Sequence, residues 1–299
     1  FHDLGMKAVC DIVERAMEVG IITRGGGGDF PRNVMVSPLS GVEQGEYFDV
    51  LPYAERTGDY LMGMIKTVKL PRKLKVGFSN SPANVTHATF RDLGFMAKEN
   101  GLFDVYSAGG LGNNYKMGVK VAENVKPEEV LYYVEAMVRT FTTYGNYESR
   151  AKSRTRYMQE TLGVEGYKKA YQEKLLEVKA EFKDSLLIKE SSVSAEQESN
   201  TEESVVNIKE QESQLKNVQT ESASERVITQ KQAGLYAVAY HPVGGMVPAQ
   251  KFEEIYEEIK NAAKAEVRVA PDETLYIINL NAQQAEKIHK ITADGAKNL

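Results

Sequence analysis

One stretch of the sequence divides the chain into separate folded parts. Glu190–Glu225 consists mainly of Glu, Ser, Gln, Asn and Thr, and it contains no Gly, Pro or aromatic residue. Because such a segment buries too little apolar surface to offset its ordering entropy, we expect a disordered acidic linker or inserted loop over residues 185–230. A weak helix is the competing interpretation, since Glu and Gln favour helices.

The residues on either side of this segment are patterned like folded domains. Before it, apolar spacing and β-branched runs predict alternating elements: an amphipathic helix within 8–22, a strand at 33–37, a helix at 51–68, strands at 73–79 and 101–107, and helices at 127–144 and 149–162. After it, strand 235–240, helix 248–263 and strands 266–270 and 275–280 suggest half of a ferredoxin-like repeat. The fold class is therefore α+β.

Composition excludes several functions. The net charge of −5 over 299 residues argues against a nucleic-acid binder, which needs a dominant basic face. The sequence has neither a membrane-length apolar run nor the features of a signal peptide, so we expect a cytoplasmic protein. Cys10 is the only cysteine, and His87 and His241 are isolated, so we predict no disulfide framework and no metal site in this chain.

Two cationic segments are candidates for anion binding. Arg32 follows the glycine run Gly25–Gly28 and could hold an oxyanion, although a surface Arg at a strand end is the blander interpretation. In Leu70–Lys75, the two-residue period of a strand puts Lys73 and Lys75 on one face and Arg72 on the other. A sheet edge protected by solvated lysines is the alternative to a polyanion site.

Further candidates are glycine-rich or basic. Gly109, Gly110 and Gly112 follow a predicted strand and could let a flat cofactor lie against the backbone, or could form a plain loop. A basic run on a predicted helix is either a solvated face, a clamp for cofactor carboxylates or a docking surface for an acidic electron donor: Arg150, Lys152, Arg154 and Arg156. The run Gly25–Gly28 fits neither nucleotide-binding fingerprint, so a nucleotide-binding α/β domain is a weak alternative.

The order of these segments is more specific than any one of them. The sequence resembles the assimilatory-type nitrite/sulfite reductase family through Pro31-Arg32-Asn33-Val34, Ser37-Pro38-Leu39-Ser40-Gly41, Phe48–Ala54, Leu70–Lys75, Asp92-Leu93-Gly94-Phe95, Gly109–Gly112 and Arg150–Arg156. Leu235–Leu280, which includes His241–Gly245 and Glu266–Val269, is similar to the family's second ferredoxin-like half-domain. The resemblance implies a preceding helical region at 1–23, a mixed α/β siroheme-binding domain at 24–184 and a second ferredoxin-like half-domain at 231–299.

The resemblance also implies cofactors and roles for individual residues. The family's enzymes carry siroheme and a [4Fe–4S] cluster, and they reduce sulfite to sulfide or nitrite to ammonia with six electrons from ferredoxin or a similar carrier. Arg32, Lys73 and Lys75 would face the substrate anion. The cofactor-binding positions would be Arg72, Asn33, Gly109, Gly110 and Gly112. Lys75 favours sulfite, because plant-type nitrite reductases commonly carry Asn there.

Departures from the family pattern limit what this chain is expected to do alone. The family's cluster needs four cysteines, which this chain lacks, and the chain begins at Phe1 within a helical pattern. We therefore expect an inactive fragment of a sulfite reductase. Nitrite reduction, or a non-catalytic homologue that binds siroheme or a partner protein, remain alternatives.

Overall fold

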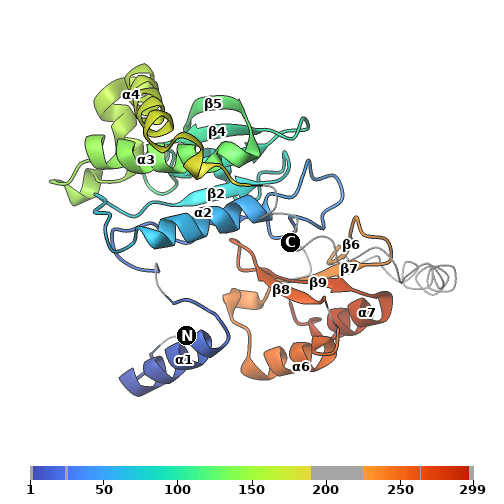
Figure 1. Ribbon diagram of the computed structural model, residues 1–299. Coiled ribbons are helices and arrows are strands. Elements are labelled where there is room, and N and C mark those ends of the chain that lie inside the picture. Colours follow the sequence, from blue (N-terminus) through green and yellow to red (C-terminus); the bar gives the residue numbers. More distant parts are fainter. Residues whose placement is uncertain (1–2, 24–25, 190–224, 263, 296–299) are drawn as a thin grey trace.

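Two α+β units make up the computed structural model, which describes residues 3–23, 26–189, 225–262 and 264–295 (Figure 1). The first unit contains a five-stranded sheet and the second a four-stranded sheet. The predicted acidic linker lies largely outside the described residues, but both of its ends belong to folded parts. Leu186 and Ile188 are buried in the core of the first unit, and Val227–Thr229 forms a strand of the second.

The sheet of the first unit is mixed, as the strand order β1-β2-β3-β4-β5 shows. Strands β1 to β3 run parallel, whereas β4 pairs antiparallel with both β3 and β5. The strands are β1 (Met35–Val36), β2 (Val76–Ser79), β3 (Leu93–Ala97), β4 (Phe103–Ser107) and β5 (Val119–Val125). The parallel part places the amino ends of β1 and β2 at one edge of the sheet, and the cationic residues precede those strands.

Helices and an aromatic cluster build the core of this unit. Phe78, Phe95 and Phe103 contact one another from adjacent strands, and Tyr53 packs edge-on against Phe103. The helices that share this core are α2 (Leu51–Gly63), α3 (Val130–Tyr144) and α4 (Met158–Phe182), and the short 3-10 turns beside them are η2 (Pro127–Glu129) and η5 (Lys183–Leu186). Within α4, Gly163 has a positive φ of 70°, so the helix is kinked there.

On the opposite face of β3 the chain approaches very closely. A Cβ atom at Gly94 would lie only 1.8 Å from the backbone oxygen of Ala88 in the 3-10 turn η1 (Ala88–Phe90). Glycine is therefore required at Gly94, because any side chain would force this turn off the sheet.

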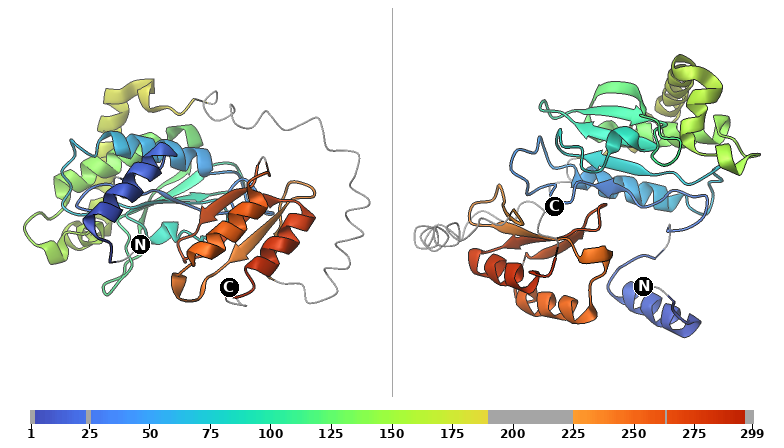
Figure 2. Two further views of the ribbon diagram at one scale, coloured as in Figure 1. Left: turned by 90° about the horizontal axis from the view of Figure 1, so that it is seen from below. Right: turned by 180° about the vertical axis from the view of Figure 1, so that it is seen from behind.

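In the second unit, helices cover one face of an antiparallel sheet (Figure 2). The sheet order is β6-β7-β9-β8, from β6 (Val227–Thr229), β7 (Tyr236–Tyr240), β8 (Glu266–Val269) and β9 (Leu275–Leu280). The helices are α6 (Ala249–Ile259) and α7 (Ala282–Ile291), with the turn η8 (Val243–Gly245) between β7 and α6. Asn281 and Gln284 form a reciprocal capping box that begins α7.

Contacts between the two units are both apolar and polar. Leu39 and Val42 from the first unit share a small core with Ala237 and Ile278 from the sheet of the second. Arg268 of β8 donates to the backbone oxygens of Pro38, at 3.1 Å, and Ser40, at 2.7 Å, and the residue pair 43 and 230 forms an isolated antiparallel bridge. The second sheet is thus fixed to the loop that follows β1.

Several predicted elements are found with changed bounds, and others were missed. The predicted helix at 149–162 is wrong in its first half. The basic run lies in the turns η3 (Arg150–Lys152) and η4 (Thr155–Tyr157) and at Arg154 between them, and α4 begins only at Met158. The sequence pattern also missed β3, β5, β6 and α7. Gly94 interrupts the apolar run of β3, and charged residues interrupt β5, so both patterns are weak.

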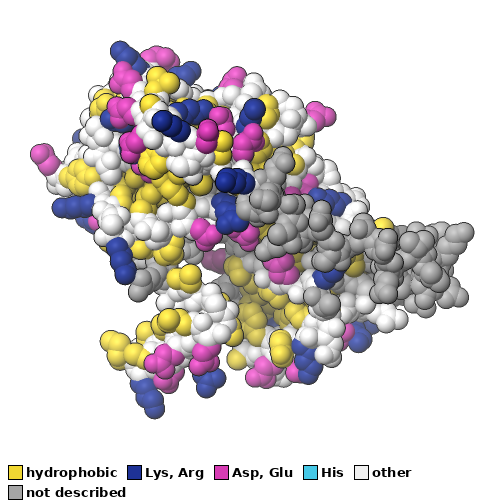
Figure 3. Space-filling model, viewed as in Figure 1, with side chains coloured by type: hydrophobic (Ala, Val, Ile, Leu, Met, Phe, Trp, Pro, Cys, Tyr) yellow, Lys and Arg dark blue, Asp and Glu magenta, His cyan; other side chains and the backbone are white. Residues whose placement is uncertain are grey.

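The N-terminal helix stands apart from the rest. Helix α1 (Met6–Glu18) has no buried residue, and Met6 and Met17 are exposed. Figure 3 shows apolar side chains on the surface of this helix. Every helix in the described ranges is too short or too polar to cross a membrane.

Candidate functional site

Backbone pairing brings the predicted anion-binding residues together. The Arg32 N–H donates to the Leu74 carbonyl oxygen at 2.8 Å, and the Leu74 N–H donates to the Phe30 oxygen at 3.3 Å. Pro31 and Leu74 thus form a parallel bridge. Since side chains alternate along extended backbone, Arg32 lies on the same face of this pairing as Lys73 and Lys75.

The site is strongly cationic, and its lysines respond to that environment. Burial lowers the pKa of Lys73, and the nearby charges of Arg154, Arg32 and Arg72 lower it further. Burial also lowers the pKa of Lys75, followed by the charges of Lys73 and Arg154. Both ammonium groups therefore release a proton more readily than an ordinary lysine.

The glycine-rich loop folds over these cations. The Arg32 guanidinium donates to the carbonyl oxygens of Gly26 and Gly28, the latter at 2.9 Å. Asp29 lies between two arginines, 2.9 Å from Arg72 and 2.6 Å from Arg150, and the hydrogen bond from Arg150 is the largest cause of its lowered pKa. The loop thus turns carbonyl and carboxylate oxygens towards the site, which is the reverse of a phosphate-binding loop.

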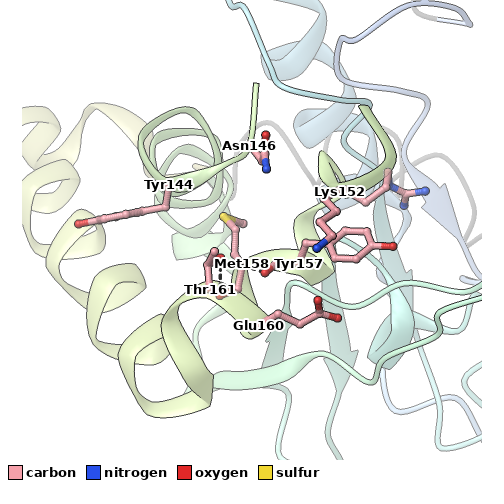
Figure 4. A pocket seen from close by; sticks show the side chains of 8 residues that line it. Tyr144, Asn146, Lys152, Tyr157, Met158, Glu160 and Thr161 are labelled. Carbon is pink, nitrogen blue, oxygen red and sulfur yellow. Dashed lines mark hydrogen bonds between the residues drawn. The ribbon is translucent and has the colours of Figure 1, made fainter. Parts of the chain in front are cut away.

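The basic run of η3 and η4 lines the site as well. Arg154 pairs with the buried carboxylate of Asp92 at 3.2 Å, while the Arg156 guanidinium lies 5.2 Å above the Tyr157 ring centre. Lys152 and Arg154 border a pocket of about 260 Å³ at the start of α4. In Figure 4, Lys152 and Tyr157 lie on one side of this pocket and Tyr144 lies on the other.

The predicted cofactor-binding residues have different surroundings. A Cβ atom at Gly109 would lie 2.8 Å from the backbone of Phe90 and Arg91, and one at Gly110 would lie 3.0 Å from the Arg156 side chain. The protein's own packing therefore requires glycine at Gly109, whereas at Gly110 only the movable Arg156 side chain would have to shift. Gly112 is exposed with a φ of 108°, and exposed Asn33 borders a pocket of about 160 Å³ beside α2 that Arg32 also lines.

Sequence reasoning missed two residues of the site. Arg91 and Asp92 precede β3 and line a small pocket of about 60 Å³ together with Lys75, Arg154 and Leu111. Asp92 was part of a recognised motif, yet nothing in its spacing showed that its carboxylate would point inward. Only the pairing of β2 with β3 brings it beneath Lys75.

The donor set fits one of the two expected cofactors. The Nε atoms of Arg32, Arg154 and Arg156 are buried and have no hydrogen-bond partner in the described part of the chain. These guanidinium groups can therefore donate to the carboxylates of siroheme. The four cysteine ligands of a [4Fe–4S] cluster are not in this chain, whose one cysteine, Cys10, is exposed on α1. Among the described residues, no group of three His, Cys, Asp or Glu side chains is placed to hold a metal ion.

Comparisons with known proteins identify the family to which the fold belongs. The family model described as "Nitrite and sulphite reductase 4Fe-4S domain" matches residues 27–179. The chain is 29% identical over 180 residues to "Sulfite reductase [ferredoxin] 1" of Mycolicibacterium paratuberculosis, covering 58% of this chain and 32% of the relative. It is 25% identical over 176 residues to "Assimilatory ferredoxin-dependent nitrite reductase" of Haloferax mediterranei, covering 55% of this chain and 30% of the relative.

A solved structure shows the same fold. The Mycobacterium tuberculosis NirA protein superposes with a TM-score of 0.72 at 23% identity, over 95% of this chain and 47% of that one. The chain thus spans about a third of the length of the two reductases described above and about half of the solved structure.

Proposed function

Because the chain belongs to the nitrite and sulphite reductase family, we propose that it forms the anion- and siroheme-binding part of a sulfite reductase. The observation that carries this proposal is the meeting of Arg32, Lys73 and Lys75 on one face, inside a wider ring of arginines. Siroheme would supply the iron at which the anion is reduced. Electrons would come from ferredoxin or a similar carrier, as the names of two relatives suggest.

Each cation has a role in this proposal. Arg32, Lys73 and Lys75 attract the substrate anion and stabilise the charge that develops as its oxygen atoms are removed. Oxygen removal also consumes protons, and lysines with lowered pKa values are suited to donate them. Arg72 and Arg154 would hold cofactor carboxylates. The thiolates of the cluster cannot come from a chain with one cysteine, so we expect turnover only in the complete reductase.

Mutation of Lys73 tests the proposal directly. In the complete reductase, Lys73→Ala should lower anion reduction by about a hundredfold, because it removes a preorganised positive charge from the reacting anion. Siroheme content, measured from its visible absorbance, should change less than roughly twofold, as expected when a single surface contact is lost. Lys66→Ala, which removes an exposed lysine at the end of α2, is the matched control and should behave like the parent.

Turnover with each anion separates the candidate functions. Sulfite reduction that exceeds nitrite reduction would agree with Lys75, whereas preferred nitrite reduction would show that Lys75 does not select the substrate. A protein that binds siroheme but reduces neither anion would instead be a non-catalytic homologue. Unchanged turnover in Lys73→Ala would show that Lys73 takes no part in the reaction.

A further inference from the structure

A buried carboxylate lies under the cationic site. Asp92 is 1% exposed, and its side chain is surrounded by groups that donate to it. Burying a carboxylate is costly unless it is paired, so these donors must offset the cost of burying Asp92. Asp92 lies too deep to contact a substrate directly, and the proposed function gives it no role.

The donors to Asp92 come from two segments that build the site. The backbone N–H of Lys75 donates to Oδ2 at 2.8 Å. Arg154 donates to Oδ1 at 3.2 Å and to Oδ2 at 3.4 Å, and the Thr155 hydroxyl donates to Oδ1. One carboxylate therefore joins the lysine-bearing segment before β2 to the basic segment before α4.

The backbone of the same residue extends this connection to the glycine segment. The Ala108 N–H donates to the Asp92 carbonyl oxygen at 2.9 Å, directly before Gly109. Thr155 reaches in the same direction, since its hydroxyl lies 3.4 Å from the Gly109 oxygen. Three segments that are far apart in the sequence are thus held at one residue.

We infer that Asp92 is a positioning residue, whose carboxylate fixes Lys75 and Arg154 in the orientation that the proposed anion site requires. The inference rests on the proposed function for what the site binds, but not for the contacts themselves. It concerns geometry that one acidic side chain imposes on two cations, and Asp92 itself does not touch the substrate.

An amide cannot replace this carboxylate. Both oxygens of Asp92 accept from donors, so Asp92→Asn would place an NH₂ group against either the Lys75 N–H or the donors of Arg154 and Thr155. The substitution preserves volume but breaks one of the two connections. It therefore separates positioning from packing.

Asp92 also balances the charges that surround the two lysines. Arg154 and Asp92 act on both lysines, Arg32 and Arg72 act on Lys73, and Lys73 and Arg91 act on Lys75. Asp92 is the acidic member of this set and raises the pKa of both lysines. Its removal should therefore lower both pKa values further.

The test uses two readouts with Asp92→Asn. In this chain, labelled on its lysine side chains, NMR titration should show the pKa values of Lys73 and Lys75 lowered relative to the parent. In the complete reductase, the KM for sulfite should rise about tenfold, the cost of a lost charge-assisted hydrogen bond, and the alkaline limb of the pH–rate profile should move to lower pH.

Glu135→Gln is the matched control. Glu135 is also a buried carboxylate, 9% exposed, and it accepts from Arg139 and Tyr60 at 2.8 Å, but it lies on α3 and does not act on either lysine. Its loss should affect stability without changing lysine titration or KM. If either readout of Asp92→Asn matches this control, Asp92 is a structural residue and the inference fails.

Two further outcomes also bear on the inference. If Asp92→Asn does not fold, Thr155→Val removes one donor at constant charge and should raise KM about threefold, whereas an unchanged KM would overturn the inference. If the complete reductase reduces neither anion, the proposed function fails. The lysine titration in this chain then decides the role of Asp92 alone.

Discussion

Two lysines of the site are held where their charged forms are disfavoured. Burial is the largest cause of the lowered pKa of both Lys73 and Lys75, and neighbouring cations add to it. A group whose pKa is lowered on folding binds its proton less tightly in the folded state. Such a lysine lowers the free energy of unfolding at neutral pH, and this loss of stability accompanies the cationic site.

Replacing Lys75 should therefore stabilise the chain at neutral pH. For Lys75→Met we expect a larger free energy of unfolding than the parent at pH 7, since both states of the parent are protonated there and only the folded state is penalised. The advantage should shrink as pH rises from the folded pKa to 10.5, the ordinary value. Urea unfolding at a series of pH values measures this, and equal stabilities at pH 7 would contradict it.

Gly94 offers a second prediction for a single residue. Gly94→Ala should lower the free energy of unfolding by about 3 kcal/mol, because its Cβ would meet the Ala88 backbone oxygen and not a movable side chain. Gly58→Ala in α2 is the control. Nothing lies within 4 Å of its Cβ, so the better helix former should stabilise by up to about 1 kcal/mol. Urea unfolding compares the two, and similar effects would contradict the close contact at β3.

At the level of elements, α7 depends on its first turn. The Asn281 side chain accepts from the Gln284 N–H at 2.9 Å, and the Gln284 side chain accepts from the Asn281 N–H at 3.1 Å. Asn281→Ala should cost about 1 kcal/mol of unfolding free energy, as for other helix caps. Hydrogen exchange in the first turn of α7 should accelerate, whereas Gln283→Ala in the same turn should leave it unchanged.

The sequence predicted elements well where one periodicity extended over several turns or residues. Helices α2, α3 and α6 and strand β9 lie at the predicted places, because each presents one continuous apolar face to a core. Strand β3 was missed because its pattern depends on Gly94, whose purpose is visible only with η1 packed against it. The segment before α4 was predicted as helix but forms the turns η3 and η4, because Arg150 and Arg154 pair with distant carboxylates, Asp29 and Asp92.

The candidate site was predictable only in part. Charge and spacing made Arg32, Lys73 and Lys75 candidates, and only the family resemblance selected them; β pairing does bring them to one face. The acidic residues Asp29 and Asp92, which lie among these cations, could not be predicted, because their contacts join positions far apart in the sequence. The sequence therefore predicted an anionic ligand but not the carboxylates of Asp29 and Asp92 that lie among the cations.

For the whole molecule, the contacts between the two units determine how they are oriented. Arg268→Ala should weaken this junction by about 2 kcal/mol, because a guanidinium that donates to two carbonyl oxygens is lost. Calorimetry should then resolve two unfolding transitions more widely separated than in the parent. Glu266→Gln, which removes the ion pair of Arg268 but keeps both carbonyl contacts, should leave the separation unchanged.

The junction has a consequence for how such a chain can change over generations. Residues 225–232 return to the loop after β1 through backbone and side-chain contacts, including Lys231 with Glu46 and Gln232 with Gly41. The contacts at the junction thereby determine the orientation of the second sheet. Each doubling of the length of the connecting segment adds only about 0.6 kcal/mol of loop-closure entropy. Insertions and deletions can therefore change the length of that connection while the orientation of the two units is inherited intact.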